Sequence, residues 1–149
     1  MAKLIYIIIA RFTSQIINKH SAVPLVASLE DLRRTLKSFS SASSGGPDGL
    51  RPQHLRDLFD ASAGGTFEKT LLNFCNLILS GRVPDIVRPY FFGASLHALC
   101  KKDGGIRPIA VGLTLRRLCS KLANSLALIK CQNILNNRQF GVGTKSGAK

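Results

Sequence analysis

The segment "CKKDGGIRPIAVG", residues 100–112, places a turn between two apolar runs. The runs are "FFGASLHALC", residues 91–100, and "IRPIAV", residues 106–111, and both have the composition of β-strands. The residues "DGG" between them predict a loop at residues 103–105, because a short loop that contains glycine is typical of a β-hairpin. Pro108 fits only an edge strand or a bulge. The sequence therefore predicts an antiparallel hairpin that projects from the rest of the chain.

The predicted loop gives the hairpin a cationic pair. Lys102 is expected opposite Ile106, and Lys101 opposite Arg107 on one face of the hairpin. Like charges that face each other repel, and a phosphate between them would relieve the repulsion. Lysine supplies a point charge, arginine a bidentate fork, and the glycine-rich turn exposes backbone N–H groups. Lys101 and Arg107 are therefore candidate phosphate ligands, although a hairpin with solvated basic side chains fits the spacing equally well.

Helical spacing of apolar residues predicts four helices around this hairpin. Ser28 and Asp31 have the spacing of a capping box, and Thr66 and Thr114 are expected to cap the two longest helices at their N-termini. Gly81 is expected to end the third helix. The predicted helices cover residues 28–39, 51–59, 66–81 and 115–135.

The remaining segments are predicted to lack regular structure. The run "SSASSGG", residues 40–46, has the composition of a flexible loop and leads into a turn at Pro47. The glycine-rich tail, residues 136–149, is also expected to be a loop, and residues 1–27 receive no assignment. The predicted fold class is thus α+β: mainly helical, with one projecting antiparallel hairpin. A chain of 149 residues is one domain or a piece of a larger one.

The charge of the chain points to an anionic partner. The sequence has 21 basic and 8 acidic residues, a net charge of +13, and Asp103 is the one acidic residue after position 100, among ten basic ones. This polarity favours contact with nucleic acid. A solvated basic surface, or a ribosomal-type protein without enzymatic activity, would have the same composition.

Neither the cysteines nor the N-terminus indicates a metal or membrane site. Cys75, Cys100, Cys119 and Cys131 lack zinc-ligand spacing, so reduced and mostly buried thiols are expected. The apolar run "LIYIIIA", residues 4–10, is too short to span a bilayer, and no signal-peptide cleavage site follows it. No membrane partner is predicted, and an intracellular location is expected.

Three segments resemble reverse transcriptases, especially those of non-LTR retrotransposons. The segment "KKDGGIRPIAVGLTLRRL", residues 101–118, closely resembles their fingers hairpin. The segment "GGPDGLRPQHLRDL", residues 45–58, is similar to an upstream element, and "RQFGVGTKSGA", residues 138–148, is similar to the approach to the palm. The resemblance implies that residues 28–149 form a partial reverse transcriptase domain, the fingers of a right-hand polymerase fold with an incomplete palm.

The resemblance also implies roles for individual residues. Lys101 and Arg107 match the residues that hold the triphosphate of an incoming deoxynucleotide, and the implied partner is an RNA or DNA template–primer. Contact with the template or the nucleotide is implied for Lys102, Pro108, Ile109, Gln139 and Gly141.

The catalytic metal ligands of this family are missing from the sequence. These polymerases hold two metal ions with palm aspartates, one soon after the segment at Gly141 and a pair in a Tyr-x-Asp-Asp turn. Neither Tyr6 nor Tyr90 is followed by such a pair, and no aspartate follows Gly141. No catalytic or metal-binding residue is therefore assigned, and Mg²⁺ is expected only for a complete polymerase. Because metal charge stabilises the transition state, the isolated chain is expected to be inactive.

Three hypotheses for the chain remain open. The first is a reverse transcriptase fragment, inactive alone, and the second is a non-catalytic basic module that binds RNA or DNA. The third is a chain without a stable fold, because its strands have lost their partners. The basic residues expected to contact nucleic acid in the second hypothesis are Arg107, Arg116, Arg117, Lys121 and Lys130.

Overall fold

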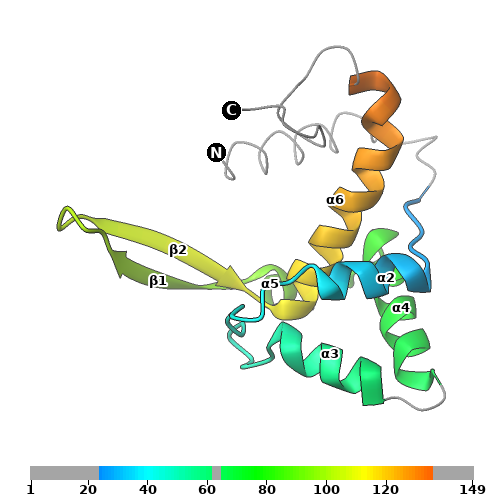
Figure 1. Cartoon of the computed structure of the whole chain (residues 1–149), viewed down its shortest axis with the longest axis horizontal. Coiled ribbons are helices and arrows are strands. Elements are labelled where there is room, and N and C mark those ends of the chain that lie inside the picture. Colours follow the sequence, from blue (N-terminus) through cyan, green and yellow to red (C-terminus); the bar gives the residue numbers. More distant parts are fainter. Residues whose placement is uncertain (1–23, 62–64, 136–149) are drawn as a thin grey trace.

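A computed structural model describes residues 24–61 and 65–135 of the chain. The elements follow in the order α2 (Leu29–Lys37), α3 (Pro52–Ala61), α4 (Thr66–Leu79), α5 (Arg88–Phe92), β1 (Ala94–Cys100), β2 (Ile106–Gly112) and α6 (Thr114–Leu135). Figure 1 shows the two strands as an arm that projects from a body of helices. The predicted mixture of helices with one antiparallel hairpin is confirmed.

The first described helix begins at the predicted capping box. The Asp31 amide donates to Ser28 Oγ at 3.2 Å, and the Ser28 amide donates to Asp31 Oδ2 at 3.0 Å. The bond from the Ser28 amide stabilises the carboxylate and holds the pKa of Asp31 below its ordinary value. Because this cap is satisfied within four residues, local sequence is sufficient to start α2 at Leu29.

The core lies where α2, α3, α4 and α6 meet. Leu32, Leu118 and Leu122 are completely buried, and each comes from the apolar stripe of its helix. Burying a leucine side chain contributes about 1.5–3 kcal/mol, so these positions hold the helices together. The buried hydrophobic residues of this cluster are Ala27, Leu32, Leu36, Phe39, Leu55, Phe59, Leu71, Cys75, Phe91, Leu118, Cys119 and Leu122.

The two cysteines of the core are buried and reduced. Cys75 and Cys119 are buried and form no disulfide, whereas Cys100 on the arm is exposed. The hydrogen bond with Cys119 and burial raise the pKa of the Cys75 thiol. Cys75 therefore stays protonated, and its neutral thiol packs in the core like a small hydrophobic side chain. The expectation of mostly buried thiols is confirmed at these two positions, and Cys100 is the exposed exception among the described cysteines.

Both predicted threonine caps are wrong. Gly65, with φ of 71°, precedes α4, and Thr66 is already its first helical residue. Thr114 is the first residue of α6, and its hydroxyl donates to the Leu50 carbonyl oxygen at 2.5 Å instead of capping the helix. The predicted C-terminal glycine is confirmed, because Gly81 follows α4 with φ of 75°.

The predicted first strand begins too early. Phe91 and Phe92 belong to α5, and the strand starts only after Gly93. Phe91 is buried, and its ring packs edge-on against Phe74 at 6.0 Å between centroids. This core contact outweighs the strand preference of the two phenylalanines.

The hairpin register also differs from the prediction. The Lys101 amide donates to the Gly105 carbonyl oxygen at 2.7 Å, and the Gly104 amide donates to the Lys101 carbonyl oxygen at 3.1 Å. The loop is therefore residues 102–104, and Arg107 lies opposite Leu99. Gly104, with φ of 80°, takes the left-handed position of the turn, which fixes this register. Lys101 and Arg107 share a face but are diagonal neighbours, so their predicted direct opposition is wrong.

The structure leaves some predictions outside its range. Gln139 and Gly141, the tail and the N-terminal apolar run lie outside the described residues. Among the helices that are described, none combines the length and hydrophobicity needed to cross a membrane.

Candidate nucleic-acid interface

The tip of the arm carries exposed cations. Lys101, Lys102 and Arg107 are all exposed, and none of their side chains donates a hydrogen bond to a residue in the described part of the chain. The neighbouring Asp103 uses Oδ1 to accept a hydrogen bond from the Gly105 amide at 3.1 Å. The three cations are therefore available to an external anion.

The geometry of the tip suits phosphate oxygens. Diagonal neighbours across an antiparallel pair are separated by about 7–8 Å, so Lys101 and Arg107 repel less than directly opposed residues would. A β-carbon at Gly105 would lie 3.5 Å from Lys101 Cδ, so the lysine stem passes over this glycine. Two long side chains at this spacing can contact oxygens of one phosphate or of successive phosphates.

Pro108 and Ile109, the strand residues that follow Arg107, lie on opposite faces of the arm. Ile109 shares the face of Lys101 and Arg107 and is half-buried, whereas Pro108 lies on the opposite face and is exposed. A ligand held by Lys101 and Arg107 would therefore lie on the side of Ile109. The template contact implied for Pro108 would need the other face of the arm.

Three of the four helix cations expected to contact nucleic acid make contacts within the chain. Arg116 Nη1 donates to the Phe92 carbonyl oxygen at 2.7 Å. Arg117 Nη2 donates to the Thr114 hydroxyl at 2.9 Å, and Lys121 Nζ lies 4.6 Å from the centroid of the Phe39 ring. These side chains are therefore not part of the surface at the tip of the arm. Lys130, near the far end of α6, is exposed.

Four side chains bind main-chain carbonyls of the segment between α2 and α3, and we name them the carbonyl clasp. Their donors come from α3 and α6, and the acceptors extend from Ser38 to Leu50. The bonds are Lys121 Nζ to Ser38 O at 3.1 Å, Arg56 Nη1 to Phe39 O at 3.3 Å, Arg117 Nη2 to Ser44 O at 2.5 Å, and Thr114 Oγ1 to Leu50 O at 2.5 Å.

The carbonyl clasp holds the segment that contains the predicted loop at residues 40–46, and Ser44 is its one acceptor within that range. Residues 40–46 form no helix or strand, as predicted. Four of the carbonyls in and around this segment have protein donors, so the backbone does not depend on water for those bonds. The turn predicted at Pro47 is confirmed, because the Gly49 amide donates to the Gly46 carbonyl oxygen at 3.0 Å. The partners lie far along the chain, so local composition carried no signal for them.

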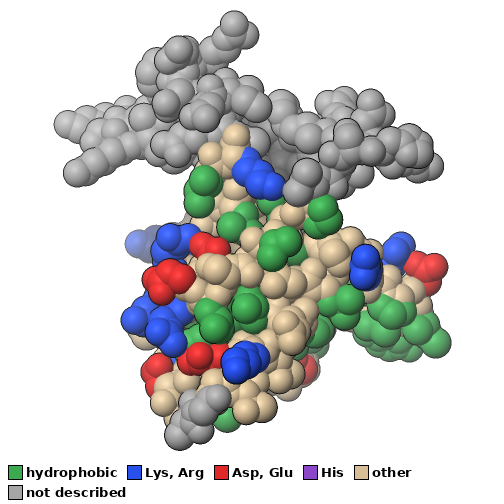
Figure 2. Space-filling view, turned by 90° about the vertical axis from the view of Figure 1, so that its right-hand side faces the viewer, with side chains coloured by type: hydrophobic (Ala, Val, Ile, Leu, Met, Phe, Trp, Pro, Cys, Tyr) green, Lys and Arg blue, Asp and Glu red, His purple; other side chains and the backbone are tan. Residues whose placement is uncertain are grey.

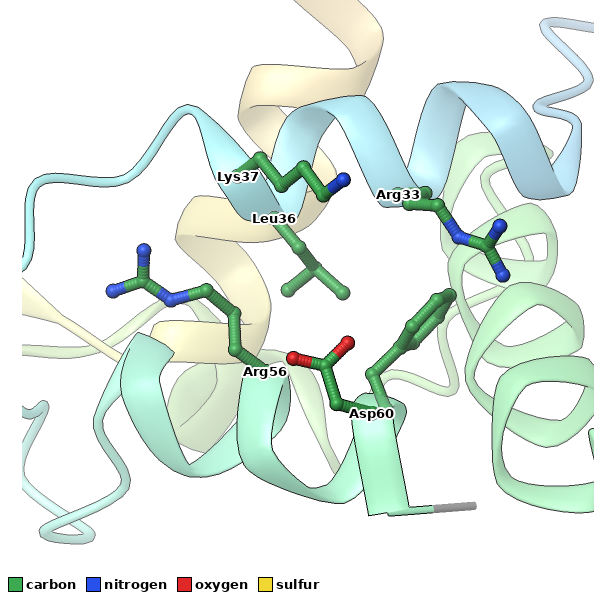
Figure 3. Close-up of a pocket in the computed structure, with 6 residues that line it drawn as sticks. Arg33, Leu36, Lys37, Arg56 and Asp60 are labelled. Atoms are coloured by element: carbon green, nitrogen blue, oxygen red, sulfur yellow. The ribbon is translucent and has the colours of Figure 1, made fainter. Parts of the chain in front are cut away.

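A small cavity on the helical body does not enlarge the candidate site. Its volume is about 40 Å³, which is room for only a few water molecules. Figure 3 shows the guanidinium groups of Arg33 and Arg56 on opposite sides of the cavity and pointing away from it. The cavity is too small for a nucleotide. Its lining residues are Arg33, Leu36, Lys37, Arg56, Phe59 and Asp60.

Elsewhere on the body, charges of both signs lie together. Arg33 pairs with Glu68 at 3.2 Å, and Arg34 pairs with Asp31 at 2.6 Å. Figure 2 shows basic side chains beside acidic ones on one face, with hydrophobic side chains between them. This face offers no uniformly basic surface to a polyanion.

Neither the described side chains nor known proteins indicate a metal site or a family. The described ranges contain no group of three or more His, Cys, Asp or Glu side chains that could hold a metal ion. Comparison of the chain with family models, curated proteins and solved structures finds no match.

Proposed function

We propose that this chain binds nucleic acid as the fingers portion of a reverse transcriptase of the non-LTR retrotransposon type. The observation that carries the proposal is the set of exposed cations at the end of the projecting arm, which donate no side-chain hydrogen bond within the described residues: Lys101, Lys102 and Arg107. Their ligands in this proposal are the phosphates of a template strand and of an incoming deoxynucleotide. The resemblance of residues 101–118 to a fingers hairpin supports this assignment.

Charge supports the same proposal. The last third of the chain carries a net charge of +9, since ten basic residues accompany Asp103. An excess of this size attracts polyanions over the range of the Debye length, about 8 Å at physiological salt. A non-catalytic RNA- or DNA-binding module would share this property, so binding alone does not separate the two functions.

The first test is loss of oligonucleotide binding when the tip loses two cations. We expect Lys101→Gln with Arg107→Gln to weaken binding of a labelled single-stranded RNA, measured by fluorescence anisotropy. The slope of log K against log salt concentration is negative. It should become shallower by about 1.4, because each phosphate contact on a single strand contributes about −0.7 and the variant loses two.

The matched control removes two exposed cations from the helical body. Lys69→Gln with Arg82→Gln gives the same net charge as the tip variant, and both residues are exposed. This control should keep the slope within about 0.3 of the unmodified chain. Equal losses in the two variants would show that binding depends on total charge and not on the arm.

The second test concerns catalysis. We expect no primer extension on an RNA template with Mg²⁺, because the sequence has no Tyr-x-Asp-Asp segment to hold the metal ions. Addition of a deoxynucleoside triphosphate should nevertheless shift the amide resonances around Lys101 and Arg107. Shifts with RNA but not with the triphosphate would favour the non-catalytic module, and robust incorporation would overturn the expected inactivity.

A further inference from the structure

Within residues 24–61 and 65–135, the outer edge of β1 pairs with no other strand. The sheet in the described part of the chain has two strands, so the outer side of each strand lacks a neighbouring strand. Lys101 is hydrogen-bonded to Gly105 across the hairpin, and the antiparallel ladder alternates. Leu99, His97 and Ser95 therefore direct their backbone groups toward β2. The groups that point outward belong to Ala94, Leu96, Ala98 and Cys100.

The two edges of the arm differ in what they offer. The outward positions of β2 include Pro108, which has no N–H and interrupts the row of donors. No lysine or proline interrupts the corresponding row of β1, from Ala94 to Cys100. The β1 edge is thus the one that can accept a complete ladder of hydrogen bonds.

The side chains at the outward positions form one exposed apolar face. Leu96 is 74% exposed and Ile106 is 66% exposed, which is unusual for residues of this size. A hairpin of two strands is marginally stable alone, and a third strand that also covers apolar side chains would stabilise it. The apolar residues on this face are Ala94, Leu96, Ala98, Cys100, Ile106, Pro108 and Ala110.

We propose that the β1 edge binds an extended segment of a partner protein, which adds to the arm as a third strand. The outward groups alternate between N–H donors and C=O acceptors, and another polypeptide backbone matches both. A phosphate backbone would match the donors but would meet carbonyl oxygens at every second group. The β1 edge therefore fits a peptide better than a nucleic acid. The strand contact itself uses backbone groups of β1 and not the side chains of Lys101 and Arg107.

Charge defines the partner further. The tip presents Lys101 and Lys102 beyond the end of β1, with Asp103 as the one acid of the loop. A segment with acidic residues at the end near the tip would be attracted there. A second copy of this chain carries a net charge of +13 and would be repelled. The partner is therefore an apolar strand with acidic residues at one end.

The test uses a fluorescent synthetic peptide of alternating valine and threonine with two glutamates at one end. Ala98→Pro removes one outward N–H and no bond of the β1–β2 ladder, so binding should weaken about tenfold or more, since a lost hydrogen bond of about 1.4 kcal/mol is a factor of ten. Ala110→Pro removes the equivalent N–H from the outer edge of β2, and it should change binding less than about twofold.

Further variants keep the test independent of folding. Leu96→Ser alters only an exposed apolar side chain and should also weaken binding, while a peptide with two lysines in place of the glutamates should bind less tightly. Equal affinity for Ala98→Pro and the unmodified chain would overturn the proposal. So would a doubled mass in solution that Ala98→Pro abolishes, or amide shifts at Leu96 and Ala98 that RNA causes and the peptide does not.

Discussion

Leu118→Ala should lower the free energy of unfolding by about 2–5 kcal/mol, as is usual for a buried leucine truncated to alanine. Leu118 is completely buried in the first turns of α6, where it contributes to the cluster shared with α2 and α4. The substitution loses the transfer free energy of the side chain and leaves a cavity. Because domains have only about 5–15 kcal/mol of stability, this loss is a large part of the total. Urea denaturation followed by circular dichroism measures it.

Leu58→Ala is the matched control for this prediction. Leu58 lies on α3 and is 51% exposed, so the same truncation removes far less buried surface. We expect a change within about 0.5–1 kcal/mol. Equal losses in the two variants would contradict the assigned core, and a broad melt of the unmodified chain would support the hypothesis that it lacks a stable fold.

Gly46→Ala should lower the free energy of unfolding by about 1–3 kcal/mol, because the added methyl group would enter space that other atoms already fill. A β-carbon at this position would lie 2.8 Å from Leu113 Cα and 3.0 Å from the Gly112 carbonyl oxygen. Both neighbours are backbone atoms at the junction of β2 with α6, so neither can rotate away. The glycine allows residues 45–50 to pack against the base of the arm. Denaturation measures the cost, and amide shifts at Gly112 and Leu113 report its location.

Gly49→Ala provides the comparison within the same turn. Gly49 has φ of 72°, but a β-carbon there would meet nothing within 4 Å. The expected cost is about 1 kcal/mol of backbone strain, without amide shifts at Gly112. If Gly46→Ala left the resonances of Gly112 unchanged, the close packing at the base of the arm would be wrong.

Much of the fold follows from local sequence. The capping box at Ser28, the turn at Pro47 and the glycine at 81 depend on residues within one turn of each other, and all three predictions are confirmed. The hairpin itself is predicted correctly, but its predicted register is wrong. The loop contains two adjacent glycines, and the register depends on whether Gly104 or Gly105 takes the positive φ. Composition alone does not separate these two cases.

The candidate site was harder to predict than the fold. A sequence identifies Arg117 and Lys121 as cations, but their acceptors at Ser44 and Ser38 lie 73 and 83 residues away. Exposure of Lys101, in contrast, followed from its place beside a projecting turn. Local patterns therefore indicated where the arm would be, and only tertiary structure showed which cations bind within the chain.

The carbonyl clasp also sets an order of events during synthesis of the chain. Closing a contact between distant residues costs entropy, so such contacts form after local ones. The hairpin can close within about 1–10 μs of its emergence. The hydrogen bond to the Leu50 carbonyl oxygen cannot form until Thr114, 64 residues later, has been synthesised. At about 5–20 residues per second, translation needs about 3–13 s to make the 64 residues from Leu50 to Thr114. The segment from Ser38 to Leu50 therefore reaches its final conformation only once the start of α6 has been made.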